Sequence, residues 1–201
     1  MRIFLLSPAN CGGARGRMLF SEKASFALAR QLQTDGAPIG EVFSFLSGLY
    51  FRGKLSYART FAVHEGEVSR IMIITTSRGL LAPEERVGKD DLVEFAGVDI
   101  TAGDARYLEP LRRDISRLDR SIRSDAQVVL LGSIATGKYV DALMEVFGER
   151  LVFPIEFVGR GDMSRGGLLL RQAREARELE YVPVAGAVRH GRRPPKLKPL
   201  H

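Results

Sequence analysis

The chain has 201 residues, of which 45% are hydrophobic and 27% are charged, and its formal net charge is +6. The length suits one domain with a full hydrophobic core, and the composition is that of a globular protein rather than a disordered one. The apolar runs are far shorter than the roughly 20 residues that a membrane helix needs, so we expect no membrane contact. Cys11 is the only cysteine and cannot form an internal disulfide, which predicts a reducing compartment and a cytoplasmic protein.

Strand and helix signals alternate along the chain. The clearest helix is residues 104–123, where apolar side chains recur at spacings of three and four. Short, mostly apolar runs predict strands over residues 2–6, 39–46, 71–75, 128–131 and 151–153. We expect the other helices after a cap at Ser21 and over residues 55–61, 138–147 and about 164–177.

Apolar strands separated by helices predict a single-domain α/β fold, with a mostly parallel sheet covered by helices on both faces. Such sheets bind their ligands at the carboxyl ends of the strands. The loops that follow residues 6, 75, 131 and 153 are therefore the expected places for a site.

The first of these loops is rich in glycine and runs from Ser7 to Arg17. Its backbone N–H groups, with Arg15 and Arg17, are typical of an anion site. Asn10 can hold a water or a base edge, because its amide both donates and accepts hydrogen bonds. A plain flexible loop is the alternative, and Cys11 has no basic partner that would make it a nucleophile.

Residues 71–83 and 50–57 hold two weaker candidates. Ser77 and Arg78 follow a strand end and are expected to face the same crevice. Arg52 and Lys54 alternate with aromatic residues that include Tyr50, as in stacking platforms for nucleic acids, although a helix start with core aromatics explains this pattern equally well.

The segment Gly132 to Tyr139 nearly matches a phosphate-binding loop between a strand and a helix. Tyr139 stands where the magnesium-binding Ser or Thr belongs, which disfavours nucleotide hydrolysis. No cluster in the chain has metal-ligand spacing, so we expect no metal.

The loop over residues 154–167 is the richest in chemical groups. It holds Glu156, Arg160, Asp162 and Arg165 among four glycines, and we interpret those glycines as allowing close approach to a ligand. Asp162 or Ser164 could also simply cap the next helix.

Residues 159–201 contain eight arginines, two lysines and four carboxylates, so this segment carries the whole excess of +6. Arginine suits phosphate recognition through its planar fork of donors, and the prolines favour an extended chain. We predict a nucleic-acid-binding domain over residues 1–188 and a basic arm over residues 189–201, in which Arg192, Arg193 and Lys196 contact phosphates. A solubilising tail is the alternative.

Several segments together resemble the YaaA-like peroxide stress proteins. They are Ser7-Pro8-Ala9, Phe51-Arg52-Gly53-Lys54-Leu55, Gly79-Leu80-Leu81-Ala82-Pro83 and Arg160-Gly161-Asp162-Met163-Ser164-Arg165. The chain departs from that family at Asn10, where lysine is usual, and at Arg78, where tyrosine is usual. The resemblance implies DNA binding and a uracil-DNA-glycosylase-like α/β fold with a base-sized crevice.

We therefore predict a DNA glycosylase, a hydrolase that flips a modified base out of double-stranded DNA and excises it, leaving an abasic site. The reaction needs no cofactor, since a carboxylate stabilises an oxocarbenium-like sugar while water attacks C1′. Asp162 is the first candidate for that carboxylate and Glu156 the reserve, while Asn10 would position water or base. Arg15, Arg17, Arg160 and Arg165 would clamp phosphates. The expected pocket residues are Ser7, Tyr50, Ser77, Arg78, Gly161 and Ser164.

A bulky, phage-type base modification as substrate would make the protein a phage-defence enzyme. One alternative function is a non-catalytic DNA-binding protein that protects under stress. Another is a nucleotide-binding enzyme that uses Gly132 to Lys138.

Overall fold

The computed structural model describes residues 1–62, 70–101, 103–195 and 197. A six-stranded sheet lies at the centre, with the strand order β4-β3-β1-β6-β7-β8. Four inner strands are parallel: β1 (Arg2–Leu6), β3 (Ile71–Ile74), β6 (Gln127–Leu131) and β7 (Leu151–Pro154). The edge strands β4 (Leu80–Leu81) and β8 (Tyr181–Pro183) are antiparallel to their neighbours. A separate antiparallel pair joins β2 (Ala37–Pro38) to β5 (Arg86–Val87).

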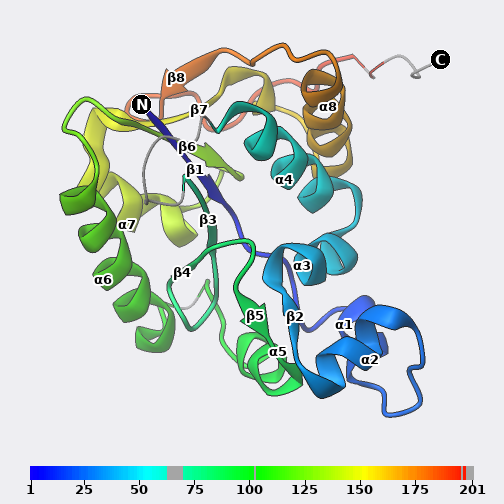
Figure 1. Ribbon diagram of the computed structural model, residues 1–201. Helices are drawn as coiled ribbons and strands as arrows, with labels where there is room; N and C mark the ends of the chain where they lie inside the picture. The colour runs from blue at the N-terminus through cyan, green and yellow to red at the C-terminus, as the bar shows by residue number, and fades with distance from the viewer. Residues whose placement is uncertain (63–69, 102, 196, 198–201) are drawn as a thin grey trace.

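The described residues form eight α-helices and two short 3₁₀ turns. The helices are α1 (Ala14–Phe20), α2 (Ala27–Thr34), α3 (Ile39–Ser47), α4 (Leu49–Phe61), α5 (Lys89–Ala96), α6 (Ala105–Ser121), α7 (Gly137–Phe147) and α8 (Asp162–Arg174); the turns are η1 (Gly148–Arg150) and η2 (Ile155–Phe157). Helices α6 and α7 lie on one face of the sheet, and α3, α4 and α8 lie on the other (Figure 1). The predicted α/β class with a mostly parallel sheet is confirmed.

The inner strands form where the sequence predicts them, because side chains buried on both faces leave an unbroken apolar run. The predicted strand over residues 39–46 is wrong, since these residues form α3. Ile39, Val42, Phe43 and Leu46 are buried there, and their spacing of three, one and three residues is that of one helix face.

Several predicted boundaries also differ. Helix α1 begins at Ala14, inside the expected loop, and Ser21 ends α1 instead of capping a helix. Helix α4 starts at Leu49 rather than residue 55, because Gly48 ends α3 with a φ of 59° and lets the chain turn directly into α4. Helix α8 starts at Asp162 after Gly161, so neither Asp162 nor Ser164 is its N-cap.

Helices α4 and α8 pack against each other through glycine. A Cβ on Gly53 would lie 2.6 Å from the Gly166 carbonyl oxygen, and one on Gly166 would lie 2.7 Å from the Leu49 carbonyl oxygen. Gly166 therefore lets two helix backbones meet, rather than a backbone and a ligand. None of the described helices is long and apolar enough to cross a membrane.

Candidate functional site at the carboxyl edge of the sheet

A pocket of about 560 Å³ opens at the carboxyl ends of the parallel strands. The chain leaves β1 for β3 on one side and later reaches β6 on the other, so the strand order reverses beside β1. Loops diverge at such a point and leave a crevice. The pocket lining comes from the loops after β1, β3 and β6, the end of α5, and the starts of α4, α7 and α8.

The loop after β1 contributes Ser7 and Asn10 to the pocket, as predicted from its position. The Asn10 Oδ1 accepts a hydrogen bond from the Gly12 N–H at 2.9 Å, which leaves its Nδ2 group to face a ligand. Cys11 also lines the pocket, but burial raises the pKa of its thiol to about 12. Cys11 is therefore a thiol and not a thiolate at neutral pH.

Lys54 of α4 is the group that the sequence places wrongly. Its side chain is 1% exposed, so it cannot serve as the phosphate contact that we predicted. The Nζ lies 2.7 Å from the Ser7 carbonyl oxygen and 2.9 Å from the Ser7 Oγ, behind the pocket lining. Burial lowers the pKa of Lys54 to about 7, with a weaker raising effect of Asp162 and a lowering effect of Arg165.

The segment that resembles a phosphate loop instead shapes the floor beside Ser7. Tyr139 is buried and donates a hydrogen bond to the Ser133 carbonyl oxygen at 2.9 Å. A Cβ on Gly132 would lie 2.8 Å from both the Ser7 Cβ and the Tyr139 hydroxyl oxygen. Gly132 is thus needed for the close approach of Ser7 and Tyr139. Burial raises the pKa of Tyr139, although a hydrogen bond with Ser7 opposes the shift.

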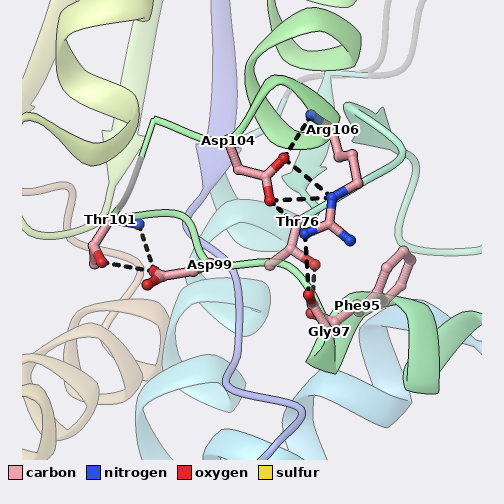
Figure 2. Close-up of polar contacts among 7 residues, drawn as sticks. All are labelled: Thr76, Phe95, Gly97, Asp99, Thr101, Asp104 and Arg106. Atoms are coloured by element: carbon pink, nitrogen blue, oxygen red, sulfur yellow. Dashed lines mark hydrogen bonds and ion pairs between the residues drawn. The ribbon is translucent and has the colours of Figure 1, made fainter.

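Residues 95–101 form a pocket wall that the sequence did not predict (Figure 2). The Thr76 hydroxyl, at the end of β3, donates to the Phe95 carbonyl oxygen at 2.8 Å. Asp99 accepts hydrogen bonds from the Thr101 N–H at 2.7 Å and hydroxyl at 2.6 Å, which lower the pKa of its carboxyl. Arg106, paired with Asp104, reaches the Gly97 carbonyl oxygen at 3.4 Å. These contacts fix the wall relative to the sheet.

Asp162 and Tyr50 complete the pocket from the starts of α8 and α4. The Asp162 carboxylate is exposed and lies 3.5 Å from Arg165. The buried Tyr50 hydroxyl has no hydrogen-bond partner among the described residues, and Arg165 lies near enough to oppose the rise in the pKa of Tyr50 that burial causes. The exposed Asp162 carboxylate is available to a polar ligand, whereas the Tyr50 hydroxyl lies buried beside Arg165.

Other predicted residues lie away from the pocket. Glu156 of η2 is half-buried, and its Oε2 has no partner within the described ranges. Ser77 lines a separate groove with Arg113, while Arg78 pairs with Asp91 and Glu94. Gly161 directly precedes Asp162, at the N-cap of α8. The pocket therefore takes Ser7, Asn10, Tyr50 and Asp162 from the predicted set.

The predicted phosphate-binding arginines occupy three places. Arg15 and Arg17 are exposed on α1, and Arg52 is exposed in a groove between α2, α3 and α4. Arg165 is mostly buried. Its guanidinium donates two hydrogen bonds to the Phe157 carbonyl oxygen. It holds the start of α8 in place and is not free to clamp a phosphate.

The C-terminal segment runs beside α8 (Figure 1). Arg160 donates to the Ser164 hydroxyl at 3.2 Å and approaches the Pro195 carbonyl oxygen at 3.5 Å. Gly159 has a φ of +72°, and a Cβ there would lie 2.3 Å from the Arg192 carbonyl oxygen. The described part of the arm thus packs on the loop before α8, with Arg192 and Arg193 exposed; Lys196 lies outside the described residues.

Within the described ranges, no three His, Cys, Asp or Glu side chains are grouped so that they could hold a metal ion. Searches of protein-family models, curated proteins and solved structures give no match to the chain. The fold and the pocket therefore define an α/β protein with a small-molecule-sized site at the carboxyl edge of a mostly parallel sheet.

Proposed function

We propose that the protein is a DNA glycosylase that takes a flipped-out modified base into the pocket and hydrolyses its bond to the sugar. The observation that carries the proposal is the meeting of Asn10, Tyr50 and Asp162 on one pocket of about 560 Å³. That volume falls within the roughly 300–1,000 Å³ of sites for small organic ligands. The resemblance to YaaA-like and uracil-DNA-glycosylase-like proteins, noted from the sequence, points to the same chemistry.

The residues divide the reaction between them. The Asp162 carboxylate faces the positive charge that develops on the sugar as the bond to the base breaks. Asn10 offers its Nδ2 group to the base, and Tyr50 contributes to the wall of the pocket.

Exposed arginines supply the contact with the DNA backbone. Arg192 and Arg193 lie beside α8, whose first residue is Asp162, so phosphates bound by these arginines would place the DNA near the pocket. Each neutralised phosphate releases counterions, which makes the affinity depend on salt. Replacing both arginines by alanine is expected to weaken binding for all DNA sequences and to reduce the salt slope by about 2.

Asp162→Asn tests the chemistry. The variant keeps the shape of the side chain but removes the charge, and we expect base release to slow by about 100-fold or more. The measurement is abasic-site formation under single-turnover conditions on DNA with bulky modified bases, with binding and thermal melting in parallel. Asp99→Asn is the matched control, because Asp99 lines the same pocket while both Thr101 contacts use its Oδ1.

The outcomes separate the proposal from its main alternative. Normal base release by Asp162→Asn contradicts the catalytic role of Asp162. DNA binding by the wild-type protein without base release from any substrate favours a non-catalytic DNA-binding protein instead.

A further inference from the structure

The proposed function leaves the buried pair of Ser7 and Lys54 unused. Ser7 stands at the end of β1 and lines the pocket, and Lys54 lies directly behind it on α4. We propose that Ser7 is a nucleophile toward the carbonyl carbon of an ester bound in this pocket, and that Lys54 is the base that takes its proton. This acyl-transfer activity goes beyond base excision.

The hydrogen bonds of Lys54 place its Nζ where it can exchange a proton with the Ser7 hydroxyl. The Nζ donates to the Ser7 carbonyl oxygen at 2.7 Å and to the Ser7 Oγ at 2.9 Å. In the amine form the 2.9 Å contact can reverse, so that the Ser7 hydroxyl donates to the Nζ lone pair. Among the described residues, no carboxylate lies within 4.0 Å of the Nζ to balance a charge. A buried ammonium without a carboxylate partner is costly, so the amine form makes up about half of the protein at pH 7 and more of it above that pH.

The groups that face Lys54 come from three elements. Tyr50 and Phe51 of α4 place their rings 4.5 and 4.7 Å from the Nζ, and these ring faces favour the cation. Asp162 and Arg165 of α8 act in opposite directions, and burial outweighs both, which brings the pKa of Lys54 to about 7. Tyr139 of α7 is not the base, because its own proton is bonded to the Ser133 carbonyl oxygen and burial raises its pKa.

The proposed step is balanced without any co-reactant other than water. The Ser7 Oγ forms a bond to the ester carbonyl carbon while its proton moves to the Lys54 Nζ, and the carbonyl π electrons move to oxygen. Collapse breaks the bond to the leaving alkoxide or phenoxide, which takes the proton back from Lys54. Water then attacks the acyl-Ser7 ester, again with Lys54 as base, and releases a carboxylic acid. Asn10 lines the same pocket, and its Nδ2 group is the donor that we assign to the oxyanion.

Two small reagents test the proposal without DNA, so the result does not depend on the glycosylase function. An alkyl fluorophosphonate should add one lasting group to the protein, and p-nitrophenyl acetate one acetyl group that is trapped by acid quenching before water releases it. Intact-mass and peptide mass spectrometry should assign both groups to Ser7. Ser7→Ala should abolish labelling. Lys54→Met should slow it by about 100-fold or more, with Lys138→Met and Ser47→Ala as matched controls from the same pocket lining.

The wild-type labelling rate supplies a second measurement, which stands even if Lys54→Met does not fold. It should rise with pH to a plateau with a midpoint at about 7, because only the amine form of Lys54 accepts the proton. Labelling at another residue, no labelling by either reagent, a rate unchanged in folded Lys54→Met, or a rate lost in Tyr139→Phe instead would each overturn the proposal.

Discussion

Helix α4 contributes Lys54 and Tyr57 to two polar clusters one turn apart, and these clusters differ in how completely their groups are partnered. The first, the Lys54 cluster, consists of Ser7, Lys54 and Tyr139. The second, the Tyr57 cluster, consists of Tyr57, Tyr181, Glu178 and Arg2. Lys54 has no ion-pair partner among the described residues and adjoins the pocket, whereas the Tyr57 cluster ends on a salt bridge between Glu178 and Arg2 at 2.5 Å.

The hydrogen bonds of the Tyr57 cluster form a chain from the Leu179 N–H to Glu178 in which each group donates to the next. The Leu179 N–H donates to the Tyr57 hydroxyl at 2.8 Å, and the two tyrosine hydroxyls lie 2.6 Å apart. Because Tyr181 donates to the Glu178 Oε1 at 3.0 Å, Tyr57 must donate to Tyr181. A network with every member satisfied holds the sheet edge to α4, while the under-compensated Lys54 cluster is suited to moving a proton.

The largest effect should come from pH, because only the Lys54 cluster holds a base with a lowered pKa. The folded pKa of about 7 lies below the roughly 10.4 of an unfolded lysine, so between these values the unfolded chain binds one more proton. Stability therefore rises with pH in this window, and the penalty for the buried charge is complete below pH 7. From about pH 7 to about pH 9.5, the wild-type protein should gain about 3 kcal/mol relative to Lys54→Met.

Urea unfolding at both pH values measures this difference. Comparison with Lys54→Met cancels the titration of the thiol and the tyrosines, and Lys138→Met should follow the wild-type protein. Parallel pH dependence in the wild-type protein and Lys54→Met would mean that Lys54 stays charged in the folded state.

A smaller effect is expected where α4 meets α8, the contact that positions both clusters. Gly166→Ala should destabilise the protein by roughly 1–3 kcal/mol, because its Cβ would lie 2.7 Å from backbone atoms of Leu49 and Tyr50. Gly167→Ala, one residue on, should be neutral or stabilise by up to about 1 kcal/mol, since its nearest neighbour is the Leu197 side chain at 3.6 Å. Denaturant midpoints compare the two, and equal shifts would show that helix propensity alone decides.

The same contrast explains which parts of the fold could be predicted. Strands β1, β3, β6 and β7 are unbroken apolar runs, and burial on both faces needs no further information. Residues 39–46 are mostly apolar and resembled a strand in composition, and only the helical spacing of their buried residues indicated α3. Lys54 was misplaced for a similar reason: basic and aromatic composition suggested a surface, while its position three after Phe51 and four before Ala58 puts it on the buried face of α4.

The sequence predicts mainly those site residues that follow inner strands. Ser7, Asn10 and Asp162 follow inner strands, and the topology brings them to one pocket. The wall at residues 95–101 depends on contacts such as that from Thr76 to Phe95, and the Ser7–Lys54 pair joins residues 47 apart in sequence. No local pattern contains such contacts. The glycines of residues 159–167 were interpreted as ligand contacts, but Gly159 and Gly166 meet the chain's own backbone.

The smallest effect is expected in the Tyr57 cluster, whose polar groups are all hydrogen-bonded. Tyr57→Phe removes a hydroxyl that accepts from the Leu179 N–H and donates to Tyr181, so it leaves buried polar groups without a partner. The expected cost is about 1–2 kcal/mol, and it should be constant between about pH 6 and about pH 9, because burial raises the pKa of Tyr57 to about 12 and also raises the pKa of Tyr181. Tyr107→Phe is the matched control: the Tyr107 hydroxyl is buried without a partner among the described residues, so its removal should cost nothing or stabilise. Urea unfolding of both variants across this range gives the comparison. Equal costs for the two would mean that the Tyr57 cluster adds nothing beyond the packing of its rings, and a cost that varies with pH would place a titrating group in the cluster that its contacts exclude.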